Sequence, residues 1–290
     1  MKKNYQVITV IGILLLLIGG VLIFSNHEQS QAHGELEPLK VTILKVGKAD
    51  AIVVQTEEKT MVIDAGEEED GEELELFLKQ QYVSCIDTLI ITHFDQDHVG
   101  GADTLVENLE IGQVLLPDYE GSNTEYMDFM TALEKKGIKP ERLTAPVELK
   151  LGQPEVLVEP PTSYPVETGA SEMDNNFSLV TTVVHGKNHL LFTGDIEKQR
   201  IREWLSGREK EKIQFLKVPH HGVYNTALKE LLQMTNPECA VICSSNKNPA
   251  DVQTLEVLKE YNVQIFQTKD GNVTAISDGK NLELSQELEE

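Results

Sequence analysis

From residue 41 onward, short apolar runs rich in β-branched residues recur along the chain, separated by turn residues or by amphipathic stretches. This alternation predicts strands for the runs and helices for the amphipathic stretches. The expected strands are 41–46, 51–56, 60–65, 88–92, 113–117, 155–160, 177–184, 189–194, 215–219, 239–244 and 263–268. The expected helices are 72–81, one beginning near 101, 124–137, 197–206, 225–235 and 251–261. The mixture predicts a large α/β or α+β domain in which helices cover the sheets. Because the first three strands follow one another without a helix, a purely parallel, doubly wound sheet is excluded.

The N-terminal part of the chain differs from the rest. Residues 7–24 form an uncharged apolar run, which as a helix would rise about 27 Å, close to the roughly 30 Å of bilayer hydrocarbon. Two lysines precede the run and acidic residues follow it, so the positive-inside rule places residues 1–6 in the cytoplasm. We therefore predict a single transmembrane anchor at 7–24, a polar tether at 25–38 and a body at 39–290 outside the cell membrane. The alternative is a signal peptide cleaved near Ser30-Gln31-Ala32, which would make the body a secreted protein.

Charge and cysteine content limit the classes of protein that this chain can belong to. Its 290 residues hold 48 Asp and Glu against 25 Lys and Arg, a net charge of −23. This acidity excludes a protein that binds nucleic acid through a broad basic face. We therefore expect metal ions to meet any polyanionic substrate. The three cysteines, Cys85, Cys239 and Cys243, exclude a disulfide framework and are expected to be buried free thiols, with a lone Cys239–Cys243 pair left open.

Potential metal ligands are densest directly after the expected strand 88–92, where the chain reads THFDQDHVGG. Two further strands also end in potential ligands, in the segments TGD at 193–195 and PHHG at 219–222. Imidazole and carboxylate groups are ligands that zinc and manganese accept, and strand ends can gather them at one point. Taken singly, each segment could instead be a solvated turn, a helix cap or a surface histidine pair. The candidate ligands are His93, Asp95, Asp97, His98, Asp195 and one or both of His220 and His221.

The order of the motifs HxDxDHxGG, NxxSLV, TGD and PHHG resembles the metallo-β-lactamase superfamily, and within it the hydrolase domain of ComEC-type (ComEC/Rec2) DNA-uptake proteins. The resemblance spans about residues 40–280. It implies a four-layer αββα sandwich with a two-metal site on one edge. Carried over residue by residue, it places His93 and Asp95 at the first metal. It places Asp97, His98 and His220 at the second metal, with Asp195 bridging the two. Asn176 stands where many relatives place another histidine, which leaves the first site less firmly held.

Three departures from this family pattern limit the functional inference. The opening strand is followed by Lys45-Val46-Gly47-Lys48-Ala49-Asp50, where the branch reads DVGQGD. Val223 replaces the usual serine after PHHG, and 246–251 lacks the histidine of a Gly-His-Pro segment. Only one candidate span is present in place of a multi-helix channel, so DNA transport by this chain alone is not expected.

The leading functional prediction is a membrane-anchored, extracytoplasmic metallo-hydrolase, a phosphodiesterase or nuclease in which two divalent ions, Zn²⁺ or Mn²⁺, activate water. Asp97 is expected to orient the water, and His221 or Lys48 to steady a phosphate oxygen. Single-stranded DNA is one candidate substrate. Because the acidic body would repel long DNA, a small phosphoester or thioester of the cell envelope is an alternative substrate. A non-catalytic surface binding protein with a weakened metal site is the alternative from another class.

Overall fold

The computed structural model describes residues 36–162 and 172–287. Residues 37–290 make up one unit, and the following description concerns that unit. The predicted cytoplasmic residues 1–6, the anchor at 7–24 and nearly all of the tether lie outside the described residues. Among the residues that are described, no helix is long and apolar enough to cross a membrane.

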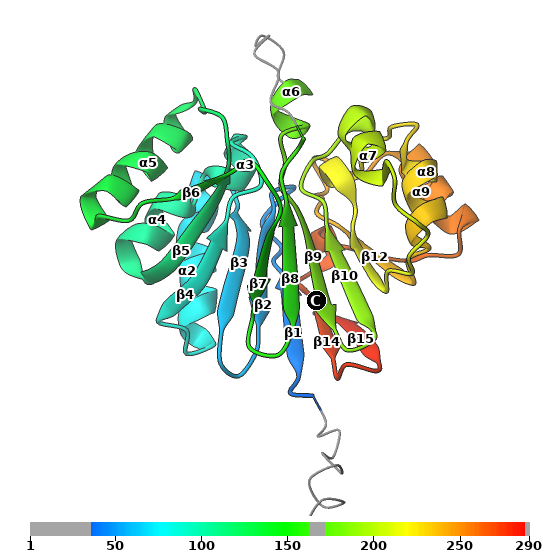
Figure 1. The fold of residues 1–290 in the computed structure, drawn as a ribbon, viewed down its shortest axis with the longest axis horizontal. Helices are drawn as coiled ribbons and strands as arrows, with labels where there is room; N and C mark the ends of the chain where they lie inside the picture. The colour runs from blue at the N-terminus through cyan, green and yellow to red at the C-terminus, as the bar shows by residue number, and fades with distance from the viewer. Residues whose placement is uncertain (1–35, 163–171, 288–290) are drawn as a thin grey trace, which may run out of the picture. The chain divides into compact units, whose positions relative to one another are not determined.

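Two mixed sheets form the centre of this unit (Figure 1). The first has the order β15-β14-β1-β2-β3-β4-β5-β6 and the second the order β13-β12-β11-β10-β9-β8-β7. The strands of the first sheet are β1 (Leu39–Ile43), β2 (Ala51–Gln55), β3 (Thr60–Ala65), β4 (Cys85–Ile90), β5 (Glu110–Pro117), β6 (Glu141–Leu143), β14 (Val273–Ser277) and β15 (Leu282–Gln286). Those of the second are β7 (Val147–Lys150), β8 (Glu155–Glu159), β9 (Val180–His185), β10 (Asn188–Phe192), β11 (Phe215–Lys217), β12 (Cys239–Ile242) and β13 (Gln264–Gln267). Each sheet combines antiparallel hairpins with a parallel half, β3 to β6 in one and β10 to β13 in the other.

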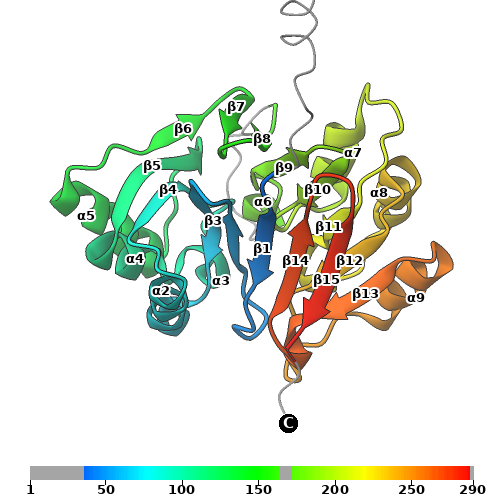
Figure 2. The same ribbon diagram turned by 90° about the horizontal axis from the view of Figure 1, so that it is seen from below.

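Helices cover the outer face of each sheet, as Figures 1 and 2 show. The first sheet is covered by α2 (Gly71–Gln80), α4 (Ala102–Asn108) and α5 (Thr124–Lys136), and the second by α7 (Lys198–Leu205), α8 (Leu228–Thr235) and α9 (Val252–Glu260). Of two short helices, α3 (Gln96–Val99) lies within the HxDxDHxGG motif and α6 (Glu172–Asn175) ends where the NxxSLV motif begins. Single turns of 3₁₀-helix lie at η1 (Glu68–Asp70), η2 (Pro219–Gly222) and η3 (Thr268–Asp270).

Three apolar cores separate these layers. Leu190 and Phe192 of β10 point into the core between the two sheets, whereas Leu191 points into the core under α7 and α8. Successive side chains of a strand face opposite sides, so a strand buried on both faces reads as a continuous apolar run. The outer core of the first sheet is built in the same way, with Leu89 of β4 packed against Leu105 and Phe129. The result is a four-layer αββα sandwich, and the predicted mixed fold is confirmed.

The strands that the sequence did not predict are β6, β7, β14 and β15. Three of them, β6, β7 and β15, are sheet edges. Their burial alternates, as in β7 and β15, or they are short, as in β6. Polar residues therefore occupy a large part of their length, and the apolar signal on which the prediction depends is weak.

Candidate metal centre

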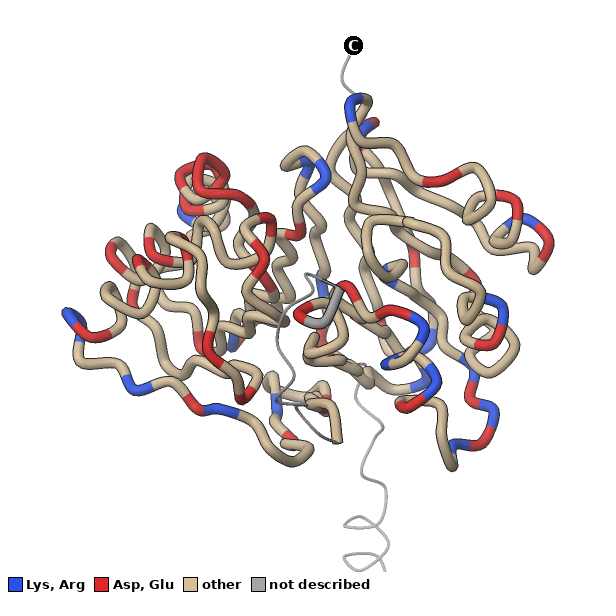
Figure 3. Tube along the Cα trace, turned by 90° about the horizontal axis from the view of Figure 1, so that it is seen from above, with Lys and Arg blue, Asp and Glu red and all other residues tan. Residues whose placement is uncertain are grey.

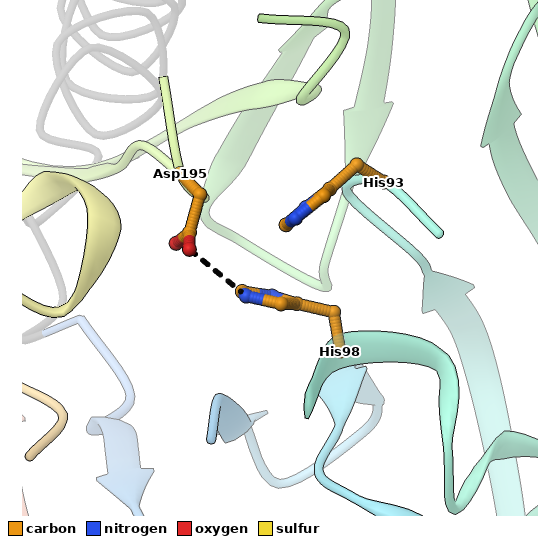
Figure 4. Close-up of side chains that lie close together, drawn as sticks. All are labelled: His93, His98 and Asp195. Atoms are coloured by element: carbon orange, nitrogen blue, oxygen red, sulfur yellow. Dashed lines mark ion pairs between the residues drawn. The ribbon is translucent and has the colours of Figure 1, made fainter. Parts of the chain in front are cut away.

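The sequence motifs converge at the edge where β4, β10 and β11 end. His93 and helix α3 follow β4, Asp195 follows β10, and η2 with its two histidines follows β11. Parallel strands of each sheet end at the same edge, so segments far apart in sequence come together there. Figure 4 shows His93, His98 and Asp195 pointing toward one another.

Three buried donor atoms, from His98, Asp97 and Asp195, lie 2.9–3.4 Å from His221 Nε2. His98 Nε2 lies 3.4 Å from His221 Nε2, and Asp195 Oδ2 lies 3.3 Å from the first and 2.9 Å from the second. Asp97 Oδ2 lies 3.1 Å from His221 Nε2. All four residues are buried. Ligand atoms of a tetrahedral ion with bonds of about 2.0–2.1 Å are about 3.3 Å apart, so these two imidazoles and two carboxylates fit a divalent cation.

A second, weaker group of donors lies beside the first. The ligand atoms of His93, His98 and Asp195 lie within 4.8 Å of one another. Among the described residues, buried His93 Nε2 has no hydrogen-bond partner, and Asp95 Oδ2 lies 3.7 Å from it. Asn176 does not join this group, because its side-chain oxygen accepts hydrogen bonds from the backbone of Glu197 (3.2 Å) and Arg200 (3.1 Å) at the start of α7. The first position therefore offers fewer donors than the second.

Outer contacts fix the orientation of both imidazoles. His98 Nδ1 lies 2.8 Å from Asp64 Oδ2, and the same carboxylate accepts hydrogen bonds from the backbone nitrogen (2.7 Å) and hydroxyl (2.8 Å) of Thr92. His93 Nδ1 lies 3.1 Å from Thr92 Oγ1 and 3.3 Å from Ser178 Oγ. Such contacts leave Nε2 as the free nitrogen and hold the ring in place for a metal ion. The sequence reasoning missed Asp64, although it stands near the end of an apolar strand, two residues before Gly66, much as Asp195 follows a strand and a glycine.

A buried ammonium group lies behind the donor atoms. Lys217 is 0 % exposed, forms an ion pair with Asp50 and lies 3.3 Å from Asp195 Oδ1. It also donates to the backbone oxygen of Gly194 at 3.1 Å. Asp50 Oδ1 lies 3.6 Å from His221 Nδ1. One oxygen of Asp195 is thus bound to Lys217, and only Oδ2 faces the histidines.

The carboxylates draw positive charge to this point. Burial alone would lower the pKa of His98, but the charges of Asp195 and Asp64 outweigh burial and raise it well above its usual value. The pKa of His221 is raised for the same reason, with Asp195 as the main partner. Conversely, the pKa of Asp195 lies well below its usual value despite burial, because His221, His98 and Lys217 favour its charged form. A metal ion binds neutral imidazole, so its binding here would release the protons of these histidines.

Comparison with known proteins agrees with this geometry. The family model described as Metallo-beta-lactamase superfamily matches residues 44–245. The chain belongs to the metallo-β-lactamase superfamily. It is 26% identical over 195 residues to ComE operon protein 3 of Bacillus subtilis (66% of this chain, 24% of that protein). It is 29% identical over 218 residues to Recombination protein 2 of Haemophilus influenzae (72% of this chain, 25% of that protein). The resemblance to ComEC-type proteins is therefore confirmed at modest identity, although the chain spans only about a quarter of the length of these relatives.

A solved structure supports the fold assignment. The metallo-beta-lactamase fold protein YhfI from Bacillus subtilis aligns with a TM-score of 0.56 at 11% identity, covering 86% of this chain and 100% of that protein. At such low identity the likeness concerns the fold alone.

The two adjacent histidines of PHHG in this metallo-β-lactamase domain differ in their surroundings, and the difference does not follow the sequence-based assignment. His221 is buried among Asp97, His98 and Asp195, whereas the His220 side chain is 25% exposed and lies 3.3 Å from Glu197. The donor clusters among the described residues include His221 and not His220. The geometry therefore favours His221, in place of the predicted His220, as a donor at the second position, and the expected substrate contact of His221 stays a prediction. Lys48, expected to contact substrate, lies at the edge of the cluster with its nitrogen 2.7 Å from Asp97 Oδ2.

Proposed function

We propose that this metallo-β-lactamase domain is a phosphodiesterase that uses two divalent ions, and that residues 7–24 anchor it so that it acts outside the cytoplasm. The observation that carries the proposal is the convergence of His98, His221, Asp97 and Asp195 on one buried point. The similarity to ComE operon protein 3 and Recombination protein 2 supports a nucleic-acid type of phosphodiester as substrate. The anchor is supported by the length and flanking charges of the apolar run.

Each residue of the centre has a definable task. His98, His221, Asp97 and Asp195 would hold one ion, and His93, Asp95 and Asp195 the other. Bound divalent ions would supply Lewis-acid chemistry, which activates water near neutral pH and offsets charge on the reacting phosphate. Asp64 keeps His98 turned toward the centre. Lys217 binds Oδ1 of Asp195, which leaves Oδ2 facing the histidines. Asp97, whose Oδ2 contacts both His221 and Lys48, is placed to orient an attacking water.

The charge distribution bears on the size of the substrate. Figure 3 shows acidic residues gathered along the adjoining elements η1 and α2. These residues include Glu68, Glu69, Asp70, Glu72 and Glu73. Such a surface repels long polyanions. We therefore propose short single-stranded DNA or a small phosphodiester as substrate. The acidity also favours the second candidate, a small phosphoester or thioester of the cell envelope.

Hydrolysis of bis-(p-nitrophenyl) phosphate and of a short single-stranded oligonucleotide, with added Mn²⁺ or Zn²⁺, tests this function. We expect turnover that a chelator abolishes and that Asp195→Ala removes, whereas His220→Ala, one residue from a proposed ligand, retains it. A metal-loaded, folded chain that cleaves only phosphomonoesters or thioesters would establish the small-molecule alternative. Inertness toward every class with metal bound would establish a binding protein.

A further inference from the structure

Lys48 touches the donor cluster from the solvent side. Its Nζ lies 2.7 Å from Asp97 Oδ2, the oxygen that is also 3.1 Å from His221 Nε2. The loop that carries Lys48 is hydrogen-bonded to the segment that it contacts, since the backbone nitrogen of Asp50 donates to the backbone oxygen of Asp97 at 3.0 Å. The proximity of Lys48 to Asp97 is therefore built into the backbone and does not depend on side-chain reach alone.

The two lysines of the centre differ in freedom. Lys217 is 0 % exposed and contacts two carboxylates and a backbone oxygen, so it is locked in place. The Lys48 side chain is 38% exposed. A lysine with a flexible four-carbon stem at the protein surface can move its charge by several ångströms without moving the backbone.

An ammonium group and a divalent ion cannot share Asp97 Oδ2 without cost. Two like charges separated by a few ångströms repel strongly in a partly buried site, and a divalent ion doubles that repulsion. An ion bound by Asp97 and His221 therefore drives the Lys48 nitrogen away from the carboxylate. A displaced ammonium at the rim of the centre can pair with an anionic group of the substrate, or with Glu67, whose charge also acts on Lys48.

We propose that Lys48 is a specificity residue that exchanges between Asp97 and the substrate: its ammonium competes with the metal ion for Asp97, and metal binding releases it to contact an anionic phosphate oxygen. The substrate half of this inference rests on the proposed phosphodiesterase function. The metal half does not, because it concerns only the competition of two cations for one carboxylate.

The metal half is tested with the full chain in detergent by chelator competition with Mn²⁺ and Zn²⁺. Lys48→Met should bind the ion at Asp97 about tenfold more tightly than wild type, and Lys48→Arg, which retains the charge, should not. Lys187→Met is the matched control and should leave metal affinity unchanged. Lys187 is exposed in the turn between β9 and β10. This turn is at the far end of β9 from Leu179, which bonds to Thr92 beside the donor cluster. Metal affinity of Lys48→Met equal to or weaker than wild type, in a variant with wild-type circular dichroism, would overturn the exchange.

The substrate half is tested on metal-saturated protein. Lys48→Met should raise KM for bis-(p-nitrophenyl) phosphate about tenfold with little change in kcat, because a contact made equally in the ground and transition states affects binding alone. Lys48→Arg should restore KM to near the wild-type value. Tighter metal binding with an unchanged KM would refute the substrate contact and retain the competition. Absence of all phosphodiesterase activity in wild type would refute the proposed function and this substrate half together, whereas the metal titration would still decide the competition.

Discussion

His220 and His221 adopt the left-handed backbone conformation in succession, with φ of 49° and 52°. Each such residue costs about 1–2 kcal/mol when it is not glycine. The tight turn points adjacent side chains in different directions, so that His221 enters the cluster while His220 turns to Glu197. Strain of this kind persists where the surrounding structure over-determines it, and it is typical of functional sites.

This difference leads to a prediction at the scale of single residues. His221→Ala should lower metal affinity by more than the roughly 10–100-fold typical of losing an outer contact of a ligand. His220→Ala should change metal affinity by less than about threefold, because the partly exposed His220 side chain lies against Glu197 and not among the donor atoms. Isothermal titration of both variants with Zn²⁺ and Mn²⁺ measures the contrast. Equal losses in the two variants would contradict the assignment of His221 as the ligand.

At the scale of elements, Lys217 connects the two sheets across the metal centre. It lies at the end of β11 in the second sheet, and Asp50 directly precedes β2 in the first. A buried ion pair is a poor source of net stability, yet removing one partner leaves an uncompensated buried charge.

We therefore expect Lys217→Met to lower the free energy of unfolding by about 3–5 kcal/mol. The double variant Lys217→Met with Asp50→Asn should recover part of this loss, because the stranded carboxylate is gone. Urea unfolding followed by circular dichroism measures all three chains. A loss below about 1 kcal/mol for Lys217→Met would show that the charges of Asp50 and Asp195 are compensated in another way.

The turn before α2 provides a pH-dependent prediction. Burial, together with neighbouring acids, raises the pKa of Asp70 to about 6, although its carboxylate accepts a hydrogen bond from the backbone nitrogen of Glu67. The ordinary pKa of an aspartate is 3.8, so the folded chain binds protons more tightly than the unfolded chain between pH 4 and pH 6. Stability is therefore lost as the pH rises through this window, and the loss is complete above pH 6.

Asp70→Asn keeps an acceptor for Glu67 and removes the ionisable group. Two pKa units correspond to about 3 kcal/mol, which we reduce to about 1 kcal/mol because the side chain is half exposed. The variant should be more stable than wild type by that amount at pH 7.5 and equal to it at pH 3.5. Urea midpoints at the two pH values decide the matter, and a variant less stable at pH 7.5 would contradict the sign.

At the scale of the whole molecule, both ends of the domain belong to one sheet. Strand β1 pairs with β2 on one side and with β14 on the other, so the first sheet is complete only when residues 273–286 have folded back. Residues 37–290 form one unit by themselves.

The proposed topology leads to a prediction for the intact chain. The full chain should sediment with membranes and resist an alkaline wash, and a chain that starts at Glu37 should stay in the soluble fraction. Protease added outside intact cells should degrade the domain of the full chain. A shortened chain in the medium would instead support cleavage near Ala32. A full-length chain in the soluble fraction would refute both forms of the prediction.

Local sequence determined most of the strands, most of the helices and the segments that carry the donors. Periodicity and strand-end ligands depend on neighbours within a few residues, which is why His93, Asp97, His98 and Asp195 were predicted from their spacing and family motif. The sheet edges β6, β7 and β15 were missed because alternating polar residues weaken that local signal.

Only the tertiary structure decided how the donors are shared. His98 and His221 are 123 residues apart, and the choice between His220 and His221 depends on two left-handed residues that no periodicity reveals. The roles of Asp64, as partner of His98, and of Lys217, as partner of Asp195, depend on how the two sheets pack. Burial turns these ordinary charged residues into parts of the candidate metal centre, because a charge removed from water must find its partner inside the fold.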